Sequence, residues 1–323
     1  MKQIRLIIFL AAFFISCSDE NKRLDPTGKD LDWFAIADSN DPIEHLRYEI
    51  YRDYDISVYY TDTIARQFRG IDGYGDSIIH YERLNPEYVI TAINNTFIYS
   101  LTRNRNDIHS GVLFFKNQVI PLLLPELFPR SVLLVEELIL NSNQTEAQGR
   151  RASPVFQGAR TLLISQMRDI GTMSAEALKK QAIEVVAPAW YGHIVSGYAT
   201  DLERFYDVST NVIAWPAETT NRNIYYILVS SGVALTYKPH WYELGFLISS
   251  ANMPGQLSGG PEVYARYYTP NREEDAISYI SAVMNYNESQ FQAIYGDKTG
   301  YDHMLSKYRV MKELMDRVRE AGR

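Results

Sequence analysis

Histidine, cysteine and acidic side chains are the groups in this chain that could bind a metal or move a proton. The six histidines are scattered, and no two have the i, i+4 spacing that places two zinc ligands on one helix face. The only cysteine is Cys17, so an internal disulfide is excluded. His193, in the segment APAWYGHIVSG, stands out as a lone candidate metal ligand. Zinc hydrolysis needs three protein ligands, an open water position and a general base.

Other catalytic motifs are not found in the sequence. The glycine-rich segments GIDGYG (70–75) and Gly259-Gly260 lack the Lys-Ser/Thr of a phosphate loop and are expected to be turns. Ser196 does not stand in the Gly-x-Ser-x-Gly motif of a nucleophile elbow. The net charge is -7 and no block of Lys or Arg occurs, which argues against nucleic acid as a partner.

The N-terminus has the features of an export signal. Lys2 and Arg5 precede an apolar run over 6–15 that is too short to span a bilayer. The run ends in Ser16-Cys17, which resembles the lipobox of bacterial lipoproteins. This resemblance implies that residues 1–16 are removed and that Cys17 is acylated. The alternative is an ordinary secretory signal followed by a chance cysteine.

The residues after Cys17 extend this interpretation. The acidic start Ser18-Asp19-Glu20 resembles the surface-export tag of lipoproteins from bacteria with SusC/SusD-type nutrient importers. That resemblance implies a location in the outer membrane, held by the lipid and facing the cell exterior. Residues 17–32 are polar and contain Pro26 and Gly28, which predicts a flexible tether. No later segment has the roughly 18 apolar residues that a membrane-spanning helix needs.

The first half of the folded part is expected to mix helices and strands. Apolar residues at helical spacing and Pro42 in the first turn predict a helix over 42–54, followed by a strand over 56–60. The apolar block 111–128 contains two prolines and is expected to form two short pieces rather than one long helix. Residues 131–140 are rich in β-branched residues and favour a strand, with a helix as the alternative.

The second half is expected to be mainly helical. A strand over 159–167 is followed by Thr172 or Ser174, either of which can cap a helix that continues towards His193. Pro188 is expected to kink or restart this helix, because proline has no amide donor. Two more amphipathic helices are predicted, one capped by Asn271 and one over 301–319.

Several of these segments together resemble a known family. They are IEHLRYEIYRDYDISVYY (43–60), LFPRSVLLVEE (127–137), Leu244-Gly245-Phe246, Glu274-Asp275-Ala276 and KYRVMKELMDRV (307–318). In order and character they resemble surface lipoproteins that are linked to SusC/SusD importers and described as zinc metallohydrolases. The resemblance implies an α+β, zincin-like fold with a small mixed sheet, several packed helices and a mainly helical C-terminal third. The resemblance covers residues 33–323. These residues are expected to form one domain, either undivided or in two lobes (33–198 and 199–323).

The zinc motif of that family, His-Glu-x-x-His, falls on Ala189-Trp190-Tyr191-Gly192-His193. In this register Ala189 replaces the first ligand and Trp190 replaces the catalytic glutamate. Only His193 is retained, and Glu274 lies in the region of the third ligand. The resemblance therefore implies a degenerate member with no catalytic residues and no cofactor, in which His193 and Glu274 are remnants. Each also has a structural explanation: His193 as a hydrogen-bonded core residue, and Glu274 as part of a helix cap.

Aromatic residues are the candidates for ligand binding. The chain has 24 tyrosines, and Trp190, Tyr191, Trp241 and Tyr242, with Trp215, could line a groove for an extended sugar or peptide. Large aromatic residues also dominate protein cores, so burial is the alternative.

Three functions follow from these features. The first is a non-catalytic accessory protein of the importer, which binds a peptide or oligosaccharide nutrient or the importer itself. The second is an active zinc metallopeptidase or metallohydrolase whose other ligands are not apparent from the sequence. The third is a glycan-binding surface lipoprotein with no catalytic ancestry.

Overall fold

The structure is a computed structural model of the chain. It describes residues 32–86, 97–142, 150–158, 160–212, 224–225, 228–229, 240–249 and 267–322. Residues 36–323 form one compact unit and residues 1–35 form another. The predicted signal sequence, Cys17 and nearly all of the tether lie outside the described residues, as does Trp215. The sheet and the helices belong to the unit at 36–323.

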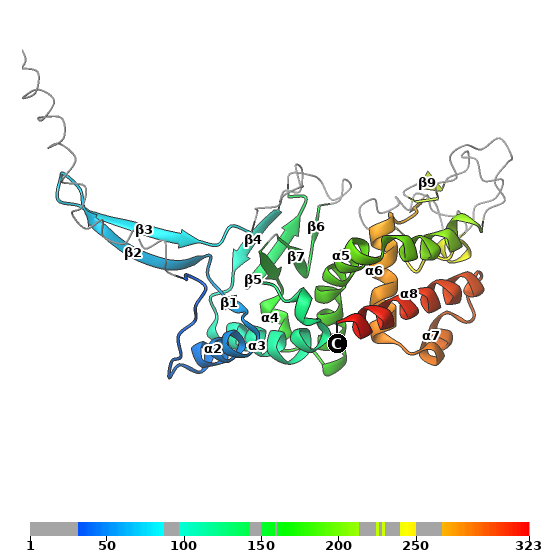
Figure 1. Cartoon of the computed structure of the whole chain (residues 1–323), viewed down its shortest axis with the longest axis horizontal. Coiled ribbons are helices and arrows are strands. Elements are labelled where there is room, and N and C mark those ends of the chain that lie inside the picture. The colour runs from blue at the N-terminus through cyan, green and yellow to red at the C-terminus, as the bar shows by residue number, and fades with distance from the viewer. Residues whose placement is uncertain are drawn as a thin grey trace, which may run out of the picture. The chain divides into compact units, whose positions relative to one another are not determined.

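A six-stranded mixed sheet is built around one long strand, β5 (Figure 1). The first half of β5 pairs in parallel with β1 and β8, and β7 continues the sheet as the antiparallel neighbour of β8. The second half of β5 pairs with β4 and β6, both antiparallel. The strands are β1 (Ser57–Tyr59), β4 (Phe97–Leu101), β5 (Ser131–Leu140), β6 (Arg151–Ala152), β7 (Val155–Gln157) and β8 (Thr161–Ile164). The predicted strand at 131–140 is confirmed. The strand expected over 159–167 is shorter.

Three helices contact the parallel part of this sheet: α2 (Pro42–Tyr54) lies against β1, and α3 (Arg105–Phe114) and α4 (Met167–Ile170) lie against β5. The predicted helix at 42–54 is confirmed to the residue. The Asp41 carboxylate accepts bonds from the Ile43 and Glu44 amides, and Asp55 ends the helix in a left-handed conformation.

The apolar block 111–128 forms a longer helix than expected. α3 continues without a gap into the π-helix η1 (Phe115–Val119) and the 3-10 helix η2 (Ile120–Leu122), and η3 (Pro125–Leu127) is a separate turn. Pro121 lies inside η2, so the prediction of two short pieces underestimated the first one. The hydrogen-bond pattern changes ahead of this proline, which cannot donate a bond itself.

A two-stranded hairpin of β2 (Thr63–Ile71) and β3 (Ser77–Arg83) was not predicted. The turn expected at 70–75 is found in part, because residues 72–76 connect the strands while Gly70 and Ile71 belong to β2. Gly75 has a φ of 93°, which favours glycine. The Asp72 carboxylate accepts bonds from the amides of Tyr74 and Asp76. Phe68, Ile71, Tyr74, Ile78 and Tyr81 are all exposed. The hairpin therefore adds little to the hydrophobic core.

The long helix α5 (Ala175–Thr210) leads from the sheet to the helical part (Figure 1). Ser174 caps it by accepting a bond from the Ala177 amide, which resolves the choice between Thr172 and Ser174. α5 does not restart at Pro188, because its only non-helical residue is Tyr198, where the helix kinks. Pro188 cannot donate to the Glu184 carbonyl, but Glu184 lies on the exposed face, where water can serve that oxygen.

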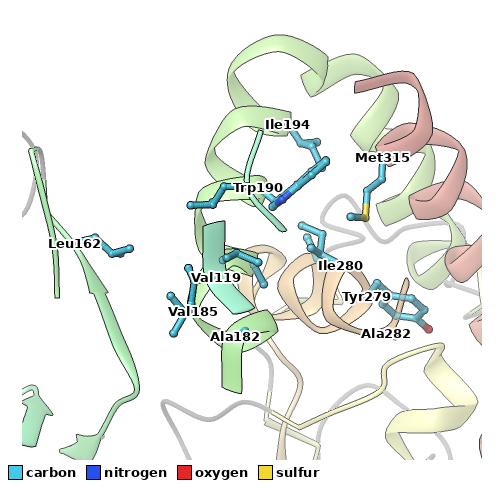
Figure 2. Close-up of a cluster of buried hydrophobic side chains, with 14 of the residues drawn as sticks. Val119, Leu162, Ala182, Val185, Trp190, Ile194, Tyr279, Ile280, Ala282 and Met315 are labelled. Carbon is cyan, nitrogen blue, oxygen red and sulfur yellow. The ribbon is translucent and has the colours of Figure 1, made fainter. Parts of the chain in front are cut away.

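The C-terminal third is helical, as predicted. It contains α6 (Arg272–Asn285), α7 (Glu288–Tyr295) and α8 (Tyr301–Ala321), preceded by the 3-10 helix η5 (Trp241–Leu244) and a two-stranded pair of β9 (Leu228–Val229) and β10 (Tyr267–Tyr268). α5, α6 and α8 pack against one another around a shared apolar core. In Figure 2, Trp190 projects from α5 towards Ile280 of α6 and Met315 of α8. The α+β class, with a mixed sheet and a helical last third, is thus confirmed.

Candidate functional site

The two remnant candidates, His193 and Glu274, lie on the neighbouring helices α5 and α6. His193 is half-buried, and its side chain forms no hydrogen bond or ion pair with the part of the chain that the structure describes. The expectation of a hydrogen-bonded core histidine is therefore wrong. Its place on the helix explains this, because His193 lies at the edge of the buried face, beside the fully buried Ile194.

Glu274 takes part in the cap of α6. Its Oε2 accepts a bond from the Asn271 amide at 3.0 Å, and the Glu274 amide donates to Asn271 Oδ1 at 2.8 Å. This reciprocal pair is a capping box, which stabilises the first turn of a helix. The structural explanation for Glu274 is confirmed.

Trp190, a candidate both for a groove and for the core, is a core residue. Only 1% of its surface is exposed, and its indole Nε1 donates to the Leu122 carbonyl oxygen at 3.0 Å. The Arg319 guanidinium lies over the indole, 5.3 Å from the ring centroid. Trp190 thus joins η2, α5 and α8, and of the two alternatives for this residue, burial is the one observed.

The other three aromatic candidates do not form one platform with Trp190. Tyr191 is half-buried on α5, and burial raises the pKa of its hydroxyl. Trp241 and Tyr242 are half-buried members of a cluster with His240 and Tyr295. The rings of Trp241 and Tyr242 meet edge to face at 65°, so the two do not form one shared flat platform.

A buried ion pair in the helical part is the main feature that the sequence did not reveal. Lys307 of α8 and Asp275 of α6 are both fully buried, and Lys307 Nζ lies 2.5 Å from Asp275 Oδ2. Lys307 also donates to Ser209 Oγ at 2.9 Å, and the Tyr225 hydroxyl donates to Asp275 Oδ2 at 3.0 Å. We call these four residues and the rings around them the lysine cluster.

Aromatic rings close the lysine cluster on its other sides. Lys307 Nζ lies 4.4 Å from the ring centroid of Phe205, 4.7 Å from that of Phe246 and 5.0 Å from that of Tyr279. Gly245, with a φ of 75°, ends η5 and places Phe246 against the lysine. Ring faces attract a cation, and the attraction is larger where water is absent. The ammonium group is therefore held by one carboxylate, one hydroxyl and four rings, the fourth being that of Tyr225 at 6.0 Å.

Burial governs the electrostatics of the lysine cluster. It lowers the pKa of the Lys307 ammonium to about 8, although the neighbouring Asp275 opposes this shift. Burial also raises the pKa of Asp275, against the opposing effects of Lys307 and the Tyr225 hydroxyl. Asp275 Oδ1 is buried and accepts no hydrogen bond from the described residues. Because neither charged group reaches solvent, the pair is suited to fixing helices in place and not to contacting a substrate.

A polar hollow of about 450 Å³ lies where the parallel strands β5 and β8 end. Its lining includes Glu136, Glu137, Gln166, Arg168 and Asp169. Arg168 Nη2 lies 2.9 Å from Glu136 Oε1. Gln166 has a φ of 69°, a conformation that costs a non-glycine residue free energy, and its amide donates to the Glu136 carbonyl oxygen. The carboxyl ends of parallel strands are a common place for ligands, and these side chains can hydrogen-bond hydroxyl and amide groups.

Metal sites and membrane-spanning helices are both absent from the described part of the chain. Within the described ranges, no three His, Cys, Asp or Glu side chains are grouped so that they could hold a metal ion. No helix in these same ranges is long and apolar enough to cross a membrane.

Comparison of the chain with protein families, with curated proteins and with solved structures finds no match.

Proposed function

We propose that this protein is a lipid-anchored binding protein of the outer cell surface, an accessory to a SusC/SusD-type nutrient importer and a non-catalytic relative of zinc metallohydrolases. The anchor is Cys17, and the acidic residues after it direct the protein to the cell exterior. The folded part has a zincin-like ancestry but binds its ligand without cleaving it. Its partners are the importer and a peptide or oligosaccharide nutrient.

The position of Trp190 is the observation that carries the non-catalytic part of the proposal. A general base in a hydrolase must reach a metal-bound water. At the corresponding place this chain has a buried indole that is hydrogen-bonded to the Leu122 carbonyl oxygen. An indole can neither take up a proton nor bind zinc. A second difference from the motif is Ala189, which stands in place of the first zinc ligand. His193 therefore lacks the second histidine with which it would bind zinc.

The polar hollow supports the binding part of the proposal. It is lined by carboxylate, amide and guanidinium groups, which can donate and accept bonds from sugar hydroxyls or peptide amides. Pockets of a few hundred cubic ångströms are the usual size for small ligands.

Zinc content tests the non-catalytic proposal. The full-length protein is purified in the presence of zinc, dialysed and analysed for metal, beside the His193→Ala and His45→Ala variants. His45 is an exposed histidine that pairs with Asp38, so its variant controls for surface binding. We expect far less than one equivalent of zinc in all three proteins. About one equivalent of bound zinc that is lost only in the His193→Ala variant would contradict the proposal and support an active metallohydrolase.

Membrane fractionation tests the anchor. Cys17→Ala should move the protein from the membrane to the soluble fraction, because the thiol is the only site for the lipid. Ser18→Ala, one residue further on, should leave it in the membrane. Membrane association of the Cys17→Ala protein would contradict the lipobox.

A further inference from the structure

A second hollow, lined mainly by apolar side chains, lies between the C-terminal end of α8, the helices α5 and α6, and the segment 121–125. Its volume is about 510 Å³, and its lining includes Leu122, Leu124, Trp190, Val283, Met284 and Arg319. Here it is called the apolar hollow. The bond from Trp190 to the Leu122 carbonyl oxygen fixes two of these walls relative to each other. The hollow has the size and lining of small-molecule sites.

Among the described residues that line the apolar hollow, Arg319 is the one that is ionisable. Its Nη1 donates to Asp316 Oδ1 at 3.0 Å, while the other oxygen of Asp316 accepts a bond from Lys312 Nζ. Two cations thus share one carboxylate, so Asp316 alone does not neutralise Arg319. A guanidinium has five N–H donors, and the bond to Asp316 is the one that Arg319 forms within the described residues.

The position of this guanidinium is defined by packing. It lies over the Trp190 ring, with 5.3 Å between Cζ and the ring centroid. Stacking on an indole leaves the edge of the guanidinium, where its N–H groups point, open to a ligand. Arg319 is about two-fifths exposed, 39% of its side chain, so these donors can be reached from solvent.

We propose that the apolar hollow binds an organic monocarboxylate, a molecule with one carboxylate and an apolar body. The carboxylate pairs with Arg319, and the body lies against Leu122, Val283 and Met284. Guanidinium and carboxylate match in geometry as well as charge, and burial of the apolar body supplies further free energy. An inorganic anion would gain nothing from the apolar walls, and an organic cation would be repelled.

Glu126 limits the ligand to a single charge. Gly322 lines the hollow, and the exposed Glu126 carboxylate lies so close to it that a Cβ atom at position 322 would touch the carboxylate. Glu126 is therefore at the rim of the hollow. A second carboxylate at the far end of a ligand would be close to this negative charge. The hollow should therefore prefer monocarboxylates to dicarboxylates of the same length.

Calorimetric titration of the full-length protein tests this proposal. The probes share a chain length and differ in their end groups: octanoate, octylamine, octanol and the dicarboxylate octanedioate. We expect octanoate to bind at least tenfold more tightly than octylamine or octanedioate. Arg319→Met keeps an unbranched side chain over Trp190 but removes the charge, so it should weaken octanoate binding at least tenfold and leave octanol binding unchanged. Arg309→Met, on the exposed face of the same helix, is the matched control and should change neither.

Three results would overturn the proposal. They are equal affinity for octanoate and octylamine, octanoate binding that Arg319→Met leaves intact, and no octanoate binding at millimolar concentration. Arg319→Lys guards against a folding defect, because it keeps the cation and should retain the preference for octanoate over octylamine. Neither the anchor nor the absence of zinc chemistry enters this test, so its failure would leave the proposed function standing.

Discussion

The ammonium group of Lys307 lies 2.5 Å from Asp275 Oδ2, and neither side chain has any exposed surface. The pair connects α6 to α8, and Ser209 brings in the end of α5. Moving two charges out of water costs several kcal/mol for each, and only close pairing and hydrogen bonds offset that cost. The three helices are therefore held in an arrangement in which each charge depends on the other.

Removing both partners should cost less than the two single losses added together. Asp275→Asn and Lys307→Met each leave a buried charge without its partner, and we expect each to lower the free energy of unfolding by about 3–5 kcal/mol. The double variant should lose less than the sum of the two, with a coupling of about 1–3 kcal/mol. Urea denaturation of the four proteins measures this. Additive losses would show that the two residues act independently.

Stability should rise as the pH increases from about 8 to about 10. The folded-state pKa of Lys307 is lowered to about 8, below its unfolded value, so in this window the unfolded state binds more protons. Below pH 8 both states hold the proton, and the cost of burying the charge is constant. The raised pKa values of the tyrosines Tyr206, Tyr225 and Tyr279 oppose this rise near pH 10, where tyrosine ionises in the unfolded chain, so the effect of Lys307 is measured against a variant that keeps these tyrosines.

The measurement is urea denaturation at several pH values for the wild type and for Lys307→Met. The wild type should gain on the order of 2–3 kcal/mol across the window relative to the variant. Parallel curves for the two proteins would mean that Lys307 titrates at its ordinary pKa.

Local sequence patterns predicted the helices and strands well where the patterns were strong. The helix at 42–54 and the strand at 131–140 have clear periodicity or β-branched runs, and both are observed. Pro188 misled because tertiary packing can keep a proline inside a helix, and here the missing bond falls at Glu184 on the exposed face. The hairpin β2–β3 was missed since its strands, mostly exposed, lack regular alternation of apolar and polar residues.

The lysine cluster could have been suspected from α8. Met304, Met311, Leu314, Met315 and Val318 define its buried face, and Lys307 falls on that same face. A charged residue on an apolar stripe predicts a buried partner. Which acid provides it could not be read from the sequence, because Glu273, Glu274 and Asp275 all stand in the first turn of α6. Only the packing of α6 against α8 selects Asp275.

The capping role of Glu274 predicts a difference between two substitutions. Glu274→Gln keeps an oxygen that can accept the Asn271 amide, so stability should change by less than about 0.5 kcal/mol. Glu274→Ala removes the acceptor and should cost about 0.5–2 kcal/mol, the range found for helix caps. Thermal and urea unfolding of both variants measure this. If Glu274 were a metal ligand, the Glu274→Gln and Glu274→Ala variants would both lose zinc. Metal analysis of the two variants therefore separates a capping role from a metal-binding role.

Trp190 should prove to be a structural residue. Trp190→Phe leaves the Leu122 carbonyl oxygen without its indole donor, and we expect a loss of about 1–3 kcal/mol in the free energy of unfolding. Trp190→Glu, which restores the residue type of the hydrolase motif, places an unpaired carboxylate in the core and should cost more than about 3 kcal/mol. Trp241→Phe, at a half-buried tryptophan, is the matched control and should lose less than Trp190→Phe. If Trp190→Glu were as stable as the wild type, the position would accept a charged side chain. The prediction that Trp190 is a buried structural residue would then be wrong.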